Sequence, residues 1–263
     1  MERSNLWAAL SQVKDHLSDV AAISVVGQQH GLVCLDADGA PLRPAKLWND
    51  TTSASQARAL VERLGAAAWS RRCGLVPVSS ITITKLAWLM ENEPHVVANA
   101  HAFMLPHDFL TFRLTGERVT DRGDASGTGW WSPISEMYEP ELLGLVVPDP
   151  QGLIDRLPTV LGPQDQAGVV TPEAAALTGL AAGTPVACGT GDNMGSAYAL
   201  GLEPGDLAMS LGTSGTVYAV SEDAVSDAAG IVAGFADATG RYLPLVATLN
   251  ATRVTDTVAL WLG

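Results

Sequence analysis

The chain has 263 residues, 47% of them hydrophobic, and a formal net charge of −13 at pH 7. A chain of this length and apolar content can bury the core of one large domain or of two smaller ones. The acidic excess argues against a nucleic-acid partner, which needs clustered lysines and arginines. No apolar run reaches the roughly 18–20 residues of a membrane span. We therefore expect a cytoplasmic protein with a small-molecule ligand and no membrane partner.

The three cysteines, Cys34, Cys73 and Cys188, are widely spaced and form no Cys-x-x-Cys motif. This pattern is typical of reduced thiols rather than of a disulfide framework. Cys34 and Cys188 lie inside strand-like apolar runs, so we expect both to be buried as small hydrophobic residues.

The first part of the chain alternates helix-like and strand-like patterns. Apolar residues three and four apart predict helices, and short runs of β-branched residues predict strands. Asp36-Ala37-Asp38-Gly39 is typical of a hairpin turn. In chain order we predict helix 6–17, strands 22–26, 32–35 and 47–48, helices 53–64 and 85–93, strand 103–105, and a helix from Pro106 to Leu114.

The second part is more irregular. Residues 120–135 are rich in Gly, Asp, Ser and Thr and indicate a loop, and prolines interrupt residues 148–172. We then predict helix 173–178, strand 185–188, helix 193–200, hairpin 207–220, strands 231–235 and 242–246, and a helix from about residue 251. The Gly- and Pro-rich residues 201–205 are the candidate domain boundary. Alternating strands and helices predict an α/β architecture.

Asp192 lies in a glycine-bracketed turn, Gly189-Thr190-Gly191-Asp192-Asn193, between a predicted strand and a predicted helix. Open α/β sheets bind ligands at this end of a strand. A carboxylate there can orient and deprotonate a hydroxyl during phosphoryl transfer. We expect the dipole of the following helix to keep it ionised with a low pKa. The alternative is that Asp192 or Asn193 only caps the helix.

A second turn, Gly212-Thr213-Ser214-Gly215, follows an apolar strand pattern. Successive N–H groups in such a turn suit a phosphate. A hairpin tip without a ligand remains open as the alternative. A serine-hydrolase elbow is disfavoured because Thr216 and a strand follow, and a Walker loop is excluded because no Gly-Lys-[Ser/Thr] follows.

These residues, with several others in register, resemble the FGGY family of carbohydrate kinases, and most closely its xylulokinase branch. The similarity covers essentially the whole chain. Besides Gly189 to Asn193, it rests on Gly27-Gln28-Gln29-His30-Gly31, Leu47-Trp48-Asn49-Asp50, Ser80 to Asn92, and Thr120 to Thr128.

The resemblance implies two ribonuclease-H-like domains, the actin-like ATPase fold, closing around a sugar and MgATP. It implies that Asp192 is the catalytic base and that the substrate is D-xylulose, phosphorylated to the 5-phosphate with ATP and Mg²⁺ as cofactors. The implied sugar-binding residues are Gln29, His30, Trp48, Asn49 and Asn193, and the implied phosphate-binding residues are Gly212, Thr213, Ser214 and Gly215. We assign no metal ligand.

Simpler interpretations stay open for several of these residues. A lone His30 is more often a hydrogen-bonded turn residue than a sugar ligand. Trp88 is expected in the core, and Trp130-Trp131 is expected to pack beneath its loop. Asp121 and Asp124 are interpreted as turn residues rather than metal ligands, and the pattern gives no role for Lys85.

The chain also departs from the family pattern. The family's first phosphate loop, Asp-x-Gly-Thr-Ser, is not found before the helix at 6–17, and its adenosine-binding turn is not found after Trp261. We therefore expect an internal piece: residues 1–201 as a sugar-binding domain without its first hairpin, and residues 202–263 as the beginning of the nucleotide domain. Such a piece is expected to be inactive alone, and a homodimer is one expected assembly. The alternatives are a non-catalytic sugar-binding or regulatory module, and an FGGY kinase for another ketose or polyol.

Overall fold

The computed structural model describes residues 8–248 and 250–262. Within them, the helices are the 3-10 helix η1 (Lys14–Asp19), α2 (Ala54–Leu64), α3 (Ala66–Cys73), α4 (Thr82–Asn92), α5 (Pro94–Asn99), α6 (Pro106–Thr115), α7 (Arg122–Ser126), α8 (Pro140–Leu143), α9 (Pro150–Ile154), α10 (Pro172–Thr178), α11 (Asp192–Ala199) and α12 (Thr252–Leu262). The strands are β1 (Val26–Gly27), β2 (Val33–Leu35), β3 (Ala102–Met104), β4 (Val119–Asp121), β5 (Trp131–Ser132), β6 (Met137–Tyr138), β7 (Thr159–Leu161), β8 (Gln166–Val169), β9 (Pro185–Ala187), β10 (Thr190–Gly191), β11 (Leu207–Leu211), β12 (Gly215–Ala219), β13 (Ala233–Ala236) and β14 (Tyr242–Thr248).

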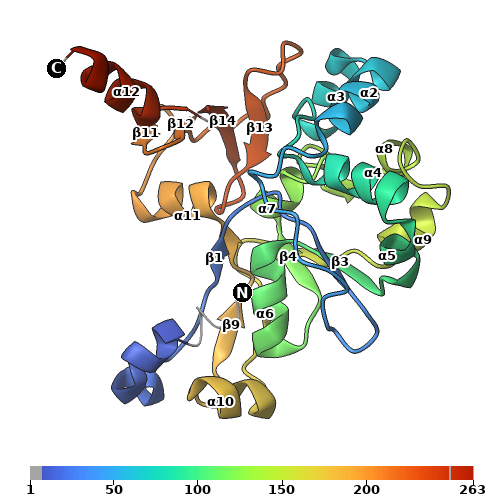
Figure 1. Ribbon diagram of the computed structural model, residues 1–263. Coiled ribbons are helices and arrows are strands. Elements are labelled where there is room, and N and C mark those ends of the chain that lie inside the picture. The colour runs from blue at the N-terminus through green and yellow to red at the C-terminus, as the bar shows by residue number, and fades with distance from the viewer. Residues whose placement is uncertain (1–7, 249, 263) are drawn as a thin grey trace.

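The strands form short pairs and one larger sheet. β1 pairs with β10 and β4 with β7 in parallel, whereas β2–β3, β5–β6 and β8–β9 are antiparallel. The larger sheet is antiparallel, with the order β11-β12-β14-β13. In Figure 1 this sheet and α12 lie on one side of the molecule, and α2 to α5, α8 and α9 lie on the other. The α/β class predicted from the sequence is confirmed.

The β1–β10 pair positions the candidate site. Val26 lies opposite Thr190, and Gly27 lies opposite Gly191. Because the strands are parallel, the turn after β1 and helix α11 after β10 begin at the same edge. The strand predicted at 22–26 is shorter than expected, since Ile23 forms only an isolated bridge with Val186 before β1 begins.

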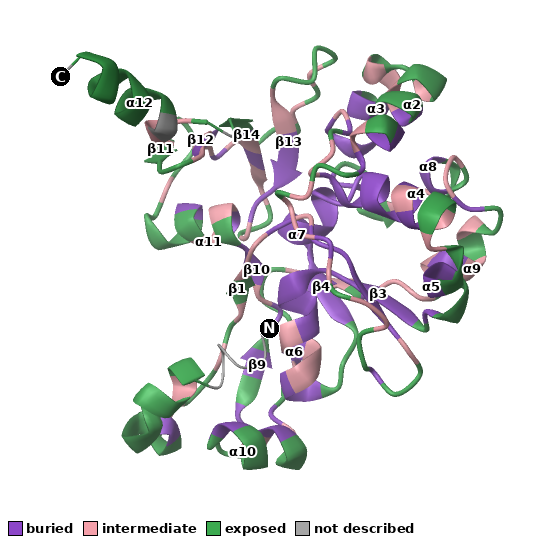
Figure 2. Ribbon diagram, in the orientation of Figure 1, coloured by how far each residue is buried: buried purple, intermediate pink, exposed green. Residues whose placement is uncertain are grey.

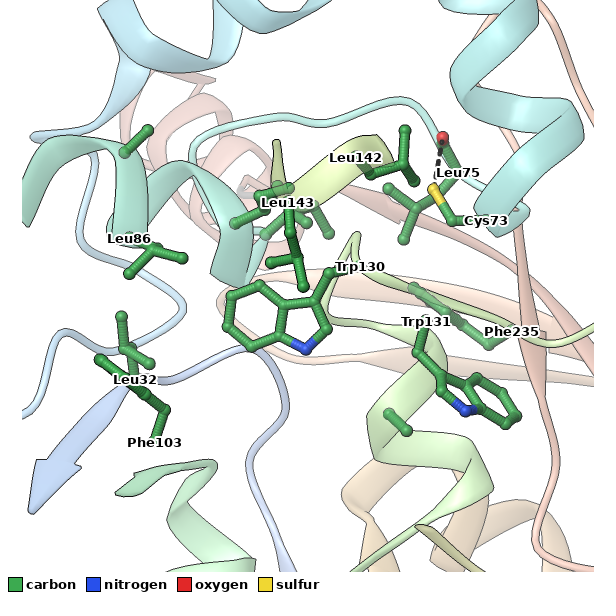
Figure 3. Packing of buried hydrophobic residues seen from close by; sticks show 14 of the residues in the cluster. Leu32, Cys73, Leu75, Leu86, Phe103, Trp130, Trp131, Leu142, Leu143 and Phe235 are labelled. Atoms are coloured by element: carbon green, nitrogen blue, oxygen red, sulfur yellow. Dashed lines mark hydrogen bonds between the residues drawn. The ribbon is translucent and has the colours of Figure 1, made fainter. Parts of the chain in front are cut away.

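One hydrophobic cluster connects the larger sheet with the helical side. Phe235 of β13 and Leu243 of β14 belong to the same cluster as Trp131 and Cys73, and Figure 3 shows Phe235 with Trp130 and Trp131 in it. The backbone also joins the two sides, since the Gly234 N–H donates to the Gly74 carbonyl at 2.8 Å. A shared core thus crosses residues 201–205, and the division into 1–201 and 202–263 stays a prediction.

Most of the strongly patterned elements are confirmed. The helices predicted at 53–64, 85–93, 173–178 and 193–200 correspond to α2, α4, α10 and α11, and the helix from Pro106 corresponds to α6. The hairpin predicted at 207–220 is β11–β12. All three cysteines are free and buried, and Trp130 and Trp131 are buried as expected.

Several predictions are wrong. Residues 120–135 are not a loop: they contain β4, α7 and β5, and every residue from Val119 to Pro133 is buried. Residues 47–48 form no strand, and the irregular stretch 148–172 contains α9, β7 and β8. The helix predicted at 6–17 consists of helical residues 8–12 and then η1. Residues 6 and 7 lie outside the described part.

Burial follows this arrangement. Figure 2 shows buried residues around α7, β13 and β4, whereas α12 is exposed. In the described part of the chain, none of the helices is both long enough and apolar enough to cross a membrane.

Candidate active site

Gln29 and His30 occupy the tight turn that follows β1. His30 has a positive φ of 65°, which a non-glycine residue adopts only when its surroundings hold it there. Gln29 is only 4% exposed, and its Nε2 is buried without a hydrogen-bond partner among the described residues. Most buried amides have a hydrogen-bond partner, so Gln29 Nε2 is a candidate donor to a bound ligand.

The His30 ring is held in one orientation by its neighbours. Nδ1 lies 2.9 Å from the Gly127 carbonyl oxygen, and the ring lies 5.5 Å from that of Phe235, centre to centre. Burial, together with the charge of Lys85, lowers the pKa of His30 to about 4. A neutral ring has one N–H, and a carbonyl only accepts, so Nδ1 carries the hydrogen. Nε2 is therefore a hydrogen-bond acceptor.

Asp192 is the first residue of α11, with Gly191 as the N-cap. It is exposed, and its Oδ1 accepts hydrogen bonds from the Asn193 N–H at 2.8 Å and from Asn193 Nδ2 at 3.1 Å. The expectation of a low pKa is wrong: surrounding protein atoms partly desolvate the carboxylate and raise its pKa, which the Asn193 hydrogen bond only partly opposes. A raised pKa makes Asp192 a stronger base.

Asn193 connects this helix start with the two neighbouring segments. Its Nδ2 lies 3.5 Å from Gln29 Oε1, and its Oδ1 accepts a hydrogen bond from Thr216 Oγ1 at 3.2 Å. The structure thus brings together Gln29, Asp192 and Asn193 as the sequence predicts, and adds Thr216, which no sequence signal indicated.

Trp48 and Asn49 are not brought into this group. They form the corners of a turn closed by the Asp50 N–H and the Leu47 carbonyl at 3.1 Å. Trp48 is half-buried and Asn49 is exposed. Among the described residues, neither makes a hydrogen bond to Gln29, His30 or Asp192, so their role as sugar ligands stays a prediction.

Two buried lysines, Lys46 and Lys85, lie close to Asp50, which ends the turn of Trp48 and Asn49. Lys85, which the sequence left without a role, donates to the Ser79 and Ser80 carbonyls at 2.8 and 2.6 Å. Burial lowers its pKa to about 8. Lys46 Nζ lies 3.7 Å from the Trp88 ring centre. Trp88 packs against the core but is only partly buried. Lys85 thus ties α4 to the loop before it.

The 212–215 loop joins β11 to β12 directly before Thr216. Its carbonyls support the start of α12, since the Ala251 N–H donates to Thr213 at 2.9 Å and the Thr252 N–H to Gly212 at 3.0 Å. Gly212 and Thr213 are exposed, and a Cβ placed on Gly212 would meet only the Ser214 carbonyl, at 3.5 Å. The Gly212 N–H donates within the loop, to the Ser214 carbonyl at 2.9 Å, and the role of residues 212–215 as a phosphate-binding loop stays a prediction.

Among the described residues, one group has the geometry to hold a metal ion. Ligand atoms of the buried His107, Asp121 and Asp124 lie within 4.8 Å of one another. These atoms are already used. Asp121 caps α7 by accepting from the Gly123 and Asp124 N–H groups, and His107 bonds Asp124. The cluster therefore does not fit a catalytic Mg²⁺. The interpretation of Asp121 and Asp124 as turn residues is wrong: Asp121 ends β4 and caps α7, and Asp124 lies within α7.

Comparison with known proteins decides the family. Residues 4–199 match the family described as "FGGY family of carbohydrate kinases, N-terminal domain". The chain belongs to the FGGY family of carbohydrate kinases. It is 53% identical to a xylulose kinase from Streptomyces rubiginosus and 54% identical to one from Streptomyces coelicolor, in each case over 98% of this chain and 53% of the relative. The chain thus spans about half the length of the curated relatives it matches.

Solved structures agree with this assignment. A xylulose kinase from Bifidobacterium adolescentis superposes with a TM-score of 0.86 at 39% identity, covering 98% of this chain and 59% of that one. A glycerol kinase with ADP from Plasmodium falciparum gives a TM-score of 0.85 at 17% identity, covering 98% of this chain and 53% of that one; this likeness shows the fold alone. The predicted actin-like ATPase fold is therefore confirmed.

Proposed function

We propose that this chain supplies the sugar site and catalytic base of an ATP-dependent ketopentose kinase, which converts D-xylulose to D-xylulose 5-phosphate. One observation carries the proposal: Asp192 and Asn193 begin α11 beside the turn after β1, where Asn193 Nδ2 lies 3.5 Å from Gln29 Oε1. The xylulose kinases among its relatives support the choice of sugar.

In this proposal His30 and Gln29 bind the sugar, and Asp192 accepts its proton. His30 Nε2 accepts a hydrogen bond from a sugar hydroxyl, and Gln29 Nε2 donates one. Asp192 then accepts the proton of the C5 hydroxyl as that oxygen bonds to the γ-phosphorus of ATP, the bond from this phosphorus to the β,γ-bridging oxygen breaks, and ADP leaves. Asn193 keeps Asp192 in place through its N–H and side-chain amide.

ATP supplies the phosphoryl group, and Mg²⁺ neutralises phosphate charge in such reactions. The Gly212, Thr213, Ser214 and Gly215 loop would hold phosphate oxygens through N–H and hydroxyl groups. We assign the metal no ligands among the described residues. A cytoplasmic location and a homodimer remain predictions from the sequence.

The test is sugar-dependent release of ADP by the full gene product, with D-xylulose, D-ribulose and glycerol compared at equal enzyme concentration. We expect kcat/KM to be highest for D-xylulose, by about tenfold or more, because a site built to hydrogen-bond its hydroxyls rejects analogues that leave those groups unpaired. Equal activity on glycerol would remove the xylulose assignment. Sugar binding without ADP release would favour the non-catalytic module.

A further inference from the structure

His107, in the first turn of α6, is fully buried and touches both turns of the candidate site. A Cβ placed on Gly27 would lie 2.8 Å from His107 Cβ, and one placed on Gly189 would lie 2.9 Å from His107 Cδ2. Gly27 ends the strand before Gln29, and Gly189 comes directly before β10. One residue, His107, therefore packs against the backbone of both segments that carry the candidate site, through its Cβ at Gly27 and through its ring at Gly189.

The hydrogen bonds of His107 fix where its hydrogens lie. Nε2 lies 3.3 Å from the Cys188 carbonyl oxygen, and Nδ1 lies 2.6 Å from Asp124 Oδ2. A carbonyl only accepts, so Nε2 must carry a hydrogen. A second hydrogen lies between Nδ1 and Asp124 Oδ2, covalently bound to one of these two atoms. His107 thus donates to Cys188 in either case.

The surrounding carboxylates favour the charged ring. Asp108 Oδ1, on α6 itself, lies 3.3 Å from Nδ1, and Asp121 Oδ1, on β4, lies 3.7 Å from Nε2. Burial alone would lower the pKa of His107, but Asp108, Asp124 and Asp121 together raise it to about 10. The donor to Cys188 is therefore present throughout the neutral range.

A second anchor acts two residues further on. Thr190 Oγ1 donates to Asp121 Oδ2 at 2.7 Å, and both side chains are buried. The residues between and beside these anchors are glycines, and Gly189 has a positive φ of 79°. Glycine backbone is held less firmly than that of other residues, so side-chain anchors decide its position.

We propose that His107 is a positioning residue that, together with Asp121, fixes residues 188–191 and thereby places Asp192 beside Gln29. This inference rests on the proposed role of Asp192 as the base. An apolar residue at position 107 could fill the space, but it would leave the Cys188 carbonyl and the Asp124 carboxylate without their donor, which is costly in a buried site.

Two amide substitutions separate the two bonds of His107. His107→Gln places an amide N–H near the position of Nε2 and can still donate to Cys188, whereas the shorter His107→Asn reaches only toward Asp124. We expect kcat to fall by about 10²-fold in the Asn variant, the cost of a small misplacement, and by less than about tenfold in the Gln variant. Sugar Kd should change little in either variant, since Gln29 and His30 are intact.

Hydrogen exchange of the full gene product tests the same point without any assay of activity. Peptides covering 186–192 should exchange faster in His107→Asn than in His107→Gln. Thr190→Val, which removes the second anchor, should also exchange faster than Thr190→Ser, which keeps it. The Thr190 pair decides the matter if the His107 variants do not fold.

The outcomes separate this inference from the proposed function. Unchanged hydrogen exchange at 186–192 in the variants would overturn the positioning role of His107. So would an equal loss of kcat in His107→Gln and His107→Asn that merely follows their loss of thermal stability. A wild-type protein that phosphorylates no sugar would count against the proposed function, and the exchange result would still decide whether His107 and Asp121 hold this segment.

Discussion

His30 offers a hydrogen-bond acceptor rather than a donor because its Nδ1–H is committed to the Gly127 carbonyl. His30→Ala removes that acceptor and should raise KM for the ketose by about 5–150-fold, the equivalent of 1–3 kcal/mol for a lost buried partner, with KM for ATP unchanged. His30→Gln, which keeps a side-chain acceptor, is the matched control. An unchanged ketose KM in His30→Ala would show that the residue serves only the turn.

Protonation of His30 would convert its acceptor into a donor. Because its pKa lies at about 4 instead of 6.5, lowering the pH from about 7 to about 5 should leave the Kd for D-xylulose nearly unchanged. Calorimetric titration at several pH values measures this. Affinity that weakens with a midpoint near the ordinary histidine value would contradict the assigned tautomer.

Asp192 should titrate above the ordinary range for an aspartate, because its pKa is raised by partial desolvation. Since only the ionised carboxylate accepts a proton, kcat should fall on the acidic side with a midpoint above about 4. The pH profile of kcat at saturating sugar checks this. A plateau that continues well below that value would indicate either a different base or a solvated carboxylate.

The buried, positively charged His107 links helix α6 to Asp121 and Asp124, and it makes the stability of the fold depend on pH. His107 has a pKa of about 10 in the fold against 6.5 ordinarily, so the folded state binds this proton more tightly. Its contribution to stability is complete below about pH 6.5 and is lost as the pH rises toward about 10.

The free energy of unfolding should therefore decrease between about pH 6.5 and 8 in the wild type. The decrease should be less steep in the double variant His107→Gln/Asp124→Asn, which also removes Asp124, because the pKa of that carboxyl is itself raised to about 7 and is held down by His107. Urea unfolding at several pH values in this window measures both slopes. The window stops at about 8 because Lys85, whose pKa is lowered to about 8, contributes the opposite slope above it. Parallel curves for the two proteins would show that His107 is not charged in the fold.

Elements with strong local patterns were predictable, and those decided by tertiary contacts were not. Helix α4 follows the spacing of its apolar residues, and α6 begins at Pro106 as predicted. The prolines at 94, 140 and 150 also begin helices, namely α5, α8 and α9, although proline at a helix start and proline as a helix stop look alike in sequence.

The prediction of a loop at 120–135 failed for a different reason. Its polar residues are buried because they bond one another: Asp121 accepts from the Gly123 N–H at 2.8 Å, and Thr128 Oγ1 donates to the Ala125 carbonyl at 2.6 Å. A composition that is typical of loops here forms a buried capping network. The local sequence pattern does not distinguish an exposed loop from a buried capping network, because the same residue types occur in both and only the surrounding tertiary contacts differ.

The candidate site was predictable where the family motifs mark it. The resemblance assigned Gln29 and Asp192 to one sugar site, and the strands that precede them, β1 and β10, do lie side by side. His107 and Phe235 could not be found this way, because each reaches the site from an element far away in sequence. The low pKa expected for Asp192 was wrong because desolvation, which raises the pKa, outweighs the backbone hydrogen bonds that lower it.

Across the whole molecule, the core that spans both sides of residues 201–205 predicts one cooperative unit. Phe235 is 3% exposed and packs in the shared cluster. Phe235→Ala should lower the free energy of unfolding by about 3–5 kcal/mol, seen as a single transition at a lower midpoint in calorimetry. Leu207→Ala is the control: Leu207 is 63% exposed, so the expected change is within about 0.5 kcal/mol.

Two separate transitions, with only one of them shifted by Phe235→Ala, would contradict this expectation. They would show that the β11–β14 sheet unfolds independently of the helical side, and that the contacts of Gly74 and Gly234 do not couple the two regions.

If Asp192 takes the proton of the sugar hydroxyl, Asp192→Asn in the full gene product removes the acceptor of that proton. The amide keeps the size of the side chain and can still accept from the Asn193 N–H, but it cannot take up a proton. We predict that kcat with D-xylulose and MgATP falls by about 10²–10⁴-fold, while the Kd for D-xylulose stays within about threefold. A variant that keeps more than about a tenth of the wild-type kcat would contradict this role and leave Asp192 a structural residue at the start of α11.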